Sequence, residues 1–246
     1  MYRQLLLIDG DIPLYQAAFA AERPIDWGDN LWTLHADVGS AAYRFDKWIA
    51  DVQDYIGESE VLVCFSGSQN WRKAVLPTYK ANRLESRKPV IYTPLREYIE
   101  GNYLSVSHES LEADDVLGIL SGRDRIIVSI DKDMKTIPGF HFNPMRPEEG
   151  VIQISPDVAN YNHMTQTLTG DSTDGYKGCP GIGVKRAERL LGELDPVDRW
   201  PVVLEAFIRA KLSPEEALKQ ARVSYILRPG DYDYHRKEVK LWQPVE

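Results

Sequence analysis

Short apolar runs alternate with amphipathic segments along this chain. Residues 2–8, 61–65 and 126–130 are rich in apolar side chains, and a polar residue follows each run at once. Runs of this length are typical of strands that are buried on both faces of a sheet. Because helical segments separate them, the strands are expected to pair in parallel through right-handed crossovers. The pattern therefore predicts an α/β fold with a mostly parallel, twisted sheet flanked by helices.

Helical periodicity marks the segments between these strands. Apolar residues recur every three or four positions in three segments that we expect to be helices: residues 14–21, 38–56 and 93–103. Residues 24–30 are expected to form a loop, and residues 140–143 and 151–154 a hairpin. The pattern becomes predominantly helical from Asp157 on. We therefore expect three parts in chain order: a core over residues 1–156, a helical region over residues 157–222 and a tail over residues 223–246.

Two acidic clusters lie at neighbouring ends of predicted elements. Asp131 and Asp133 follow the third strand, and Glu112, Asp114 and Asp115 open an amphipathic helix. Acids in a first helical turn interact favourably with the helix dipole, but this explains one or two acids better than three in four positions. Concentrating so much negative charge is unfavourable unless cations neutralise it. Carboxylate oxygens are the ligands that Mg²⁺ prefers, so the clusters indicate a divalent-metal site.

Three further carboxylates extend this set. Asp9 ends the first strand, at the edge where open α/β sheets bind ligands, although an Asp there can equally satisfy the start of the next helix. Asp171 and Asp174 precede a glycine-rich turn. The formal net charge is −8, so these eight acids alone account for it and the total does not exclude local phosphate binding.

Two segments carry features of phosphate binding. Residues 71–88 hold six basic residues against one acid, a local net charge of +5, together with aromatic residues. This mixture suits a surface that binds phosphates and stacks bases, although a solvated charged face has the same composition. Gly181 and Gly183 precede a predicted helix, so backbone N–H groups, with Lys185 and Arg186, can face a phosphate. Such turns are common, and the position directly after two acids makes this one more specific.

The remaining composition limits the class of protein. No apolar run approaches the roughly 20 residues that crossing a bilayer requires, and the N-terminal run ends at Asp9, too early for a signal peptide. Cys64 and Cys179 lack a zinc-type spacing and are expected to be free thiols. We therefore expect a cytoplasmic protein without a membrane partner.

Five motifs, in this order, resemble those of the 5′ nuclease superfamily, which includes flap endonucleases, the 5′ nuclease domain of bacterial DNA polymerase I and phage 5′→3′ exonucleases. They are Leu-Leu-Ile-Asp-Gly (6–10), Tyr-Lys-Ala-Asn-Arg (79–83), Glu-Ala-Asp-Asp (112–115), Ser-Ile-Asp-Lys-Asp (129–133), and Thr-Gly-Asp-Ser-Thr-Asp (169–174) with Gly-Ile-Gly-Val-Lys-Arg-Ala (181–187). The compact chain without a polymerase domain looks most like a stand-alone, phage-type enzyme, which would act in the host cytoplasm.

The resemblance implies a PIN-like core, a helical arch near residues 71–104 and a helix-three-turn-helix module near residues 171–192. By resemblance the metal-binding carboxylates are Asp9, Glu112, Asp114, Asp115, Asp131, Asp133, Asp171 and Asp174. Two Mg²⁺ ions about 3.5–4 Å apart would serve an in-line displacement, and Mn²⁺ would substitute. We expect Glu112, Asp114, Asp131 and Asp133 to lie closest to them, with Lys80, Arg83, Asp114 and Asp131 as the catalytic residues.

The resemblance also implies DNA, with a 5′ end or a 5′ flap, as the partner of a monomer, and an RNA–DNA hybrid as a further substrate. Lys80 and Arg83 resemble the cations that steer phosphates at the base of the arch, and Tyr15 an aromatic that stacks on a terminal base. The turn at Gly181 and Gly183 would grip duplex backbone, with K⁺ bound. With Arg72, Lys73, Lys185 and Arg186, these residues form the expected DNA-binding set.

One departure leaves alternatives open. Many members have an Asp after the second strand, where this chain has Ser66. Direct ligation from that strand is lost, although a contact through water to the hydroxyl group remains open. A protein that binds branched or 5′-ended DNA without cutting it is one alternative, but a pure binder gains nothing from carboxylates beside phosphates. A PIN-type ribonuclease is the other, and the turn before Lys185 argues for duplex DNA instead.

Overall fold

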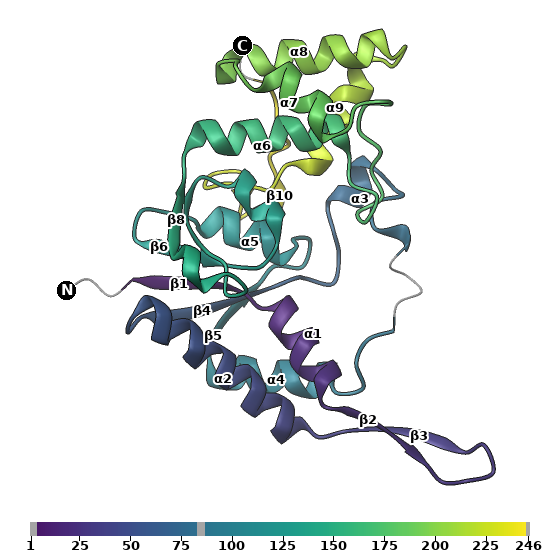
Figure 1. Ribbon diagram of the computed structural model, residues 1–246, viewed down its shortest axis with the longest axis vertical. Coiled ribbons are helices and arrows are strands. Elements are labelled where there is room, and N and C mark those ends of the chain that lie inside the picture. Colours follow the sequence, from purple (N-terminus) through teal and green to yellow (C-terminus); the bar gives the residue numbers. More distant parts are fainter. Residues whose placement is uncertain (1–3, 83–86, 245–246) are drawn as a thin grey trace.

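The computed structural model describes residues 4–82 and 87–244 and is built around one six-stranded sheet (Figure 1). In spatial order the strands are β5 (Leu104–Ser107), β4 (Glu60–Phe65), β1 (Leu5–Asp9), β6 (Arg125–Val128), β7 (Gly139–Phe142) and β8 (Val151–Ile154). The first five strands pair in parallel, and β8 pairs antiparallel with β7 as the expected hairpin. The predicted α/β fold with a mostly parallel sheet is confirmed.

Helices cover both faces of the sheet. Three pack on one face and the fourth on the other: α1 (Asp11–Ala20), α2 (Val38–Ile56), α4 (Tyr92–Asn102) and, opposite them, α5 (Ala113–Leu120). In β1, Leu6 and Ile8 face the first layer, whereas Leu7 between them faces α5. Because side chains alternate across a strand, a strand covered on both faces is apolar at every position. This explains the unbroken aliphatic run of β1.

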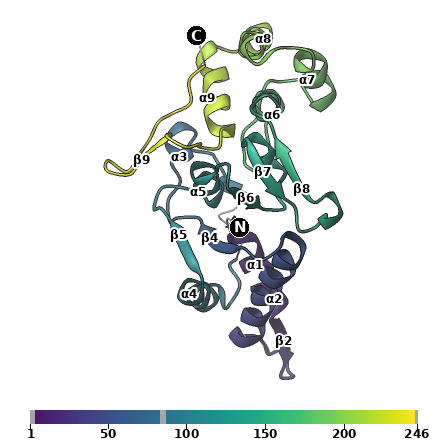
Figure 2. The ribbon, with the colours of Figure 1, turned by 90° about the vertical axis from the view of Figure 1, so that its left-hand side faces the viewer.

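Four more helices form a layer beyond the sheet, at the top of Figures 1 and 2: α6 (Pro156–Thr169), α7 (Val184–Leu191), α8 (Pro196–Arg209) and α9 (Pro214–Ser224). In α6, α8 and α9, a Pro in the first turn follows a Ser or Asp at the cap position, which is the sequence signature of a helix start. Leu168, Leu191 and Phe207 lie in the core that these helices share.

The last described segment returns to the sheet. Tyr225, Ile226 and Leu227 belong to the core between the sheet and α5, and Trp242 packs edge-on against His163 of α6. A short hairpin of β9 (Tyr232–Asp233) and β10 (Glu238–Val239) lies between them. The segment expected to be a tail therefore contributes, in its described part, to the core.

Besides β9 and β10, three strands lie where none is expected. β2 (Glu22–Asp26) and β3 (Trp32–Ala36) form an exposed hairpin that includes part of the expected loop at residues 24–30 and projects from the molecule (Figure 1). The third is β5, which lies at one edge of the sheet. Because the hairpin is largely exposed and β5 is half-covered, none of the three requires the apolar pattern by which buried strands are found.

The segment expected to form an arch is described in part. Its described elements are α3 (Arg72–Val75), an irregular stretch at residues 76–82, and α4. Residues 83–86, and with them Arg83, lie outside the described residues. None of the helices within residues 4–82 and 87–244 has the length and apolar character that crossing a bilayer demands.

Candidate active site

Acidic side chains from distant parts of the chain line one cavity of about 250 Å³. It lies at the carboxyl edge of the parallel strands, where β1 ends and α5 begins. The acidic residues that line it are Asp9, Asp11, Glu112, Asp114, Asp131, Asp133, Asp171 and Asp174. The fold thus brings together seven of the eight predicted metal ligands, and Asp115 is the exception. We call this space the acidic cavity.

Hydrogen bonds hold the carboxylates of β1 and of the loop after β6 in place. The Ser129 hydroxyl donates to Asp9 Oδ2 (2.7 Å) and accepts from the backbone N–H of Asp131 (3.0 Å). Asp131 Oδ1 accepts from the backbone N–H of Asp133 (2.8 Å). Gln166 of α6 donates to Asp133 Oδ1 (2.6 Å), so the C-terminal helices also orient this wall of the cavity.

Burial among like charges raises the pKa of four carboxyl groups in the acidic cavity, those of Asp9, Asp11, Asp114 and Asp133. Burial, with the charges of Asp11 and Asp131 adding to it, raises the pKa of Asp9 to about 7. Burial and the charge of Asp131 raise the pKa of Asp133 to about 7. Burial and the charge of Asp9 raise the pKa of Asp114 well above its ordinary value. A bound cation favours the ionised form of a carboxyl group and would reverse these shifts.

Lys80 enters the acidic cavity from the segment between α3 and α4. Its Nζ lies 2.5 Å from Glu112 Oε1 and 3.5 Å from Asp174 Oδ2. The Tyr79 hydroxyl lies within hydrogen-bond distance of the same two carboxylates, at 3.1 and 3.0 Å. Burial alone would raise the pKa of Glu112, but the charges of Arg72 and Lys80 hold it at about 2. Lys80 therefore offsets negative charge in this state of the protein.

The structure corrects the predicted roles of Asp115 as a metal ligand and of Arg72 as a DNA-binding residue. The two side chains form a buried ion pair outside the acidic cavity. Arg72 is 2% exposed and Asp115 is 0% exposed, and the guanidinium binds both carboxylate oxygens at 2.7 and 2.8 Å. The other N–H groups of Arg72 donate to Glu112 and to the backbone carbonyls of Val223 and Tyr225. All five donors are thus satisfied within the protein. Asp115 is not placed to bind metal, and Arg72 is not placed to bind DNA.

The structure adds Asp11, which is not among the predicted metal ligands. Its side chain lines the acidic cavity, and its Oδ2 accepts from the backbone N–H of Ser66 (3.2 Å). The Ser66 hydroxyl accepts from the N–H of Ala113 (3.0 Å) and so caps the start of α5. The spacing of Asp9 and Asp11, which matches that of the two acids after β6, is the signal that could have identified Asp11.

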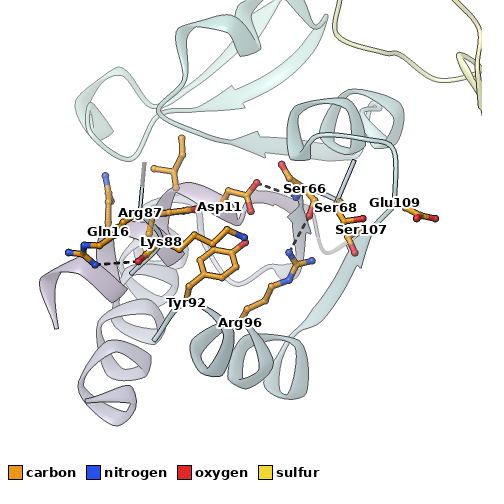
Figure 3. A pocket seen from close by; sticks show the side chains of 13 residues that line it. Asp11, Gln16, Ser66, Ser68, Arg87, Lys88, Tyr92, Arg96, Ser107 and Glu109 are labelled. Atoms are coloured by element: carbon orange, nitrogen blue, oxygen red, sulfur yellow. Dashed lines mark hydrogen bonds between the residues drawn. The ribbon is translucent and has the colours of Figure 1, made fainter. Parts of the chain in front are cut away.

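A larger cavity of about 1020 Å³ adjoins the acidic cavity (Figure 3). Asp11 and Ser66 line both, and Tyr15 lines the larger one. Its cationic lining residues are Arg87, Lys88 and Arg96. An aromatic ring among cations is the combination that single nucleic-acid strands bind.

The other residues expected to contact DNA lie on exposed parts of the chain. Lys73, Lys185 and Arg186 are exposed. Gly181 has a φ of +74°, a conformation that glycine adopts without strain, and Gly183 is the N-cap residue of α7. The turn therefore presents a helix start and two cations to solvent, as a phosphate-binding turn requires.

The acidic cavity fits hard divalent cations in its chemistry. The acidic side chains that line the cavity offer carboxylate oxygens, which are the ligands that hard divalent cations prefer. One of these oxygens, the buried Oδ1 of Asp11, has no hydrogen-bond partner among the described residues. Within the described part of the chain, no three His, Cys, Asp or Glu side chains already have the arrangement that holds an ion. In this state Lys80 contacts Glu112 and Asp174, two of the predicted ligands.

Comparisons with known proteins find relatives of this chain. The family profile described as 5′-3′ exonuclease, N-terminal resolvase-like domain, matches residues 4–152. The exodeoxyribonuclease of Enterobacteria phage T3 is 29% identical over 283 residues, which cover 98% of this chain and 93% of that protein.

Two solved structures share the fold. T5 5′-exonuclease with bound zinc has a TM-score of 0.61 and 18% identity, over 90% of this chain and 89% of that chain. The bacteriophage T5 flap endonuclease, in a pseudo-enzyme–product complex with DNA and metal ions, has a TM-score of 0.59 and 16% identity over the same shares. Since the profile match spans more than half of the sequence, the chain belongs to the 5′-3′ exonuclease family.

Proposed function

We propose that the protein is a divalent-metal-dependent nuclease that hydrolyses DNA phosphodiesters from a 5′ end or at a 5′ flap. The observation that carries this proposal is the acidic cavity, in which eight carboxylates and Lys80 meet at the carboxyl edge of the sheet. Membership of the 5′-3′ exonuclease family supports it. The metal ions and DNA in the T5 flap endonuclease complex also support it.

Mg²⁺ is the proposed natural ion, with Mn²⁺ as a substitute, because every acidic ligand is a hard oxygen donor. The proposed ligands are Glu112, Asp114, Asp131 and Asp133, with Asp9, Asp171 and Asp174 completing the set directly or through water. When bound, two such ions supply an activated water and neutralise charge on the phosphate and the leaving oxygen. K⁺ at the turn before α7 is supported by the resemblance alone.

Lys80 is the side chain proposed to act on the phosphate. It is the cation that touches Glu112 and Asp174 at the centre of the acidic cavity, on a segment separate from the metal ligands. An ammonium group offsets negative charge that develops on a phosphate during in-line displacement. In the absence of metal its contacts with the carboxylates keep the group inside the cavity, where a substrate phosphate would meet it.

The two remaining surfaces are proposed to hold DNA on either side of the reaction. The exposed turn at Gly181 and Gly183, with Lys185 and Arg186, would bind duplex backbone. The larger cavity, with Tyr15 among its cations, would hold the 5′ strand next to the acidic cavity (Figure 3).

The proposal is tested by cleavage of a 5′-labelled flap duplex and a blunt duplex, with Mg²⁺, with Ca²⁺ and with EDTA. We expect Mg²⁺-dependent products from the 5′ side, and the ratio between the substrates shows which activity dominates. A third duplex with RNA in the 5′ strand tests the RNA–DNA hybrid. Binding without cleavage in either Mg²⁺ or Mn²⁺ would show a DNA-binding protein instead and would overturn the proposal.

Asp131→Asn is the matching site variant. We expect cleavage to fall by at least about 10²-fold, because a metal ligand is lost, while DNA binding is kept or strengthened as one negative charge is removed. Asp124→Asn is the control, since Asp124 is an exposed acid just before β6. Full cleavage by Asp131→Asn would refute the assignment of the acidic cavity.

A further inference from the structure

The end of β4 brings a neutral residue to the acidic cavity, whereas β1 and the loop after β6 bring carboxylates. Ser66, directly after β4, lines the cavity, and its hydroxyl accepts a hydrogen bond from the N–H of Ala113 (3.0 Å). Its own backbone N–H donates to Asp11 Oδ2 (3.2 Å). The carboxylate of Asp11 therefore lies at the end of β4, although it belongs to α1 (Figure 3).

Close packing of β1 against β4 delivers Asp11 to this position. Gly10 donates its N–H to the carbonyl of Cys64 (2.9 Å). A Cβ at Gly10 would lie 2.9 Å from that oxygen and 2.5 Å from Val63 Cγ1, so only glycine lets the chain approach β4 this closely. The next residue is Asp11, the first residue of α1, and its side chain accepts from the backbone N–H of Ser66 at the end of the neighbouring strand. The side chain is directed across the sheet edge and not along the helix.

One oxygen of Asp11 is left without a partner. Its Oδ1 is buried and forms no hydrogen bond within the described residues, and among them Asp11 has no ion pair. Arg96 is a nearby cation, but it donates to the carbonyl of Ser66 (3.2 Å) and to Glu100 (2.8 Å). A buried carboxylate oxygen without a hydrogen-bond donor is unfavourable unless something binds there.

We propose that Asp11 is a ligand of the divalent metal in the acidic cavity, supplying through Oδ1 the carboxylate that β4 lacks. The inference rests on the proposed function, because it assigns a further ligand to the same metal site. In this arrangement Ser66 holds Oδ2 in place and leaves Oδ1 available to bind the ion. The carboxylate at the end of β4 comes from α1, so the site keeps a negative charge there although residue 66 is Ser.

The test is titration of the full chain with Mn²⁺ in the absence of DNA, with free Mn²⁺ followed by electron paramagnetic resonance. For Asp11→Asn we expect the Kd of at least one Mn²⁺ site to rise by about tenfold or more, because losing even a group that only orients metal ligands costs about 10–100-fold in affinity. Glu109→Gln is the matched control, because Glu109 is exposed and lines the larger cavity but not the acidic one. We expect its Mn²⁺ binding to equal that of the wild type.

A swap variant separates metal binding from a structural role. In Asp11→Ser/Ser66→Asp the carboxylate moves to the end of β4, where an Asp can still accept from the N–H of Ala113. We expect the double variant to recover a Mn²⁺ Kd within about threefold of the wild type, whereas Asp11→Ser alone does not. Melting temperatures of the metal-free variants show that each one is folded.

The outcomes are distinguishable. If the wild type binds Mn²⁺ and Asp11→Asn binds it within about twofold as well, Asp11 is not a ligand, and the proposed function stands. If Asp11→Asn loses Mn²⁺ but the swap variant does not recover it, Asp11 acts only by holding Ser66, which also overturns the inference. A wild type that neither binds Mn²⁺ nor cleaves DNA would overturn the proposed function, and this inference with it.

Discussion

Asp9→Asn should stabilise the metal-free protein, and more so at high pH. In the folded protein, burial and the charges of Asp11 and Asp131 raise the pKa of Asp9 from 3.8 to about 7. A carboxyl group with a raised pKa takes up its proton more readily in the folded state than in the unfolded state. Its contribution to stability is therefore largest below about pH 4 and is lost as the pH rises through about 7. Asparagine removes this dependence and can still accept from Ser129 through its amide oxygen.

The size of the effect follows from the same pKa values. Between about pH 5.5 and about pH 8 the unfolded carboxyl group stays ionised while the folded one changes from protonated to ionised. One pKa unit corresponds to about 1.4 kcal/mol, and about 1.5 units lie between pH 5.5 and the folded pKa. The advantage of Asp9→Asn over the wild type should thus be greater by about 2 kcal/mol at pH 8 than at pH 5.5, or about 4–8 °C in Tm for a chain of this length.

Thermal unfolding in EDTA, followed by circular dichroism at both pH values, measures this difference. Burial lowers the pKa of His141 to about 4 and that of His163 to about 3. Both groups therefore reduce the stability of the folded protein as the pH falls below 6.5. Their effect cancels because wild type and variant share them. Asp124→Asn is the control and should show no pH-dependent difference beyond about 0.5 kcal/mol, as for other exposed sites.

The reasoning would be refuted by an Asp9→Asn variant that is no more stabilised at pH 8 than at pH 5.5. That result would mean that Asp9 is solvated well enough to ionise freely in the folded protein. With Mg²⁺ present the order should reverse at pH 8, because a cation bound to the ionised carboxylates stabilises the folded wild type.

Two further substitutions test other parts of the structure. Lys80→Ala should slow cleavage under single-turnover conditions by about 10²-fold or more while changing the Tm little, because the ammonium offsets substrate charge; a large loss of Tm would make Lys80 a structural residue. Gly118→Ala should destabilise the fold by about 1–3 kcal/mol, since its Cβ would lie 2.1 Å from the carbonyl oxygen of Leu227. Gly101→Ala, in a helix position with nothing within 4 Å of the added Cβ, is the control and should stabilise by about 0.5–1 kcal/mol. Equal melting temperatures for these two alanine variants would show that the backbone at Leu227 does not pack closely against α5 at Gly118.

The sequence by itself identified the elements whose burial leaves a pattern. α2 begins and ends at the expected residues because its apolar stripe is continuous and Gly57 ends it. β1, β4 and β6 were found because both faces of each are covered, which requires an apolar side chain at nearly every position. The hairpin of β2 and β3 is largely exposed, so its strands need no continuous apolar run, and the sequence does not predict them for that reason.

The sequence also determined which chemistry the site has, since seven of the eight predicted carboxylates line the acidic cavity. Only the tertiary structure decided which acid of a cluster faces that cavity. Asp114 and Asp115 are neighbours in one helical turn, but successive side chains point about 100° apart. One therefore lines the cavity and the other meets Arg72 from a distant segment. The same holds for Asp11, because its position at the end of β4 depends on how closely two strands pack, and local sequence does not encode contacts between distant segments.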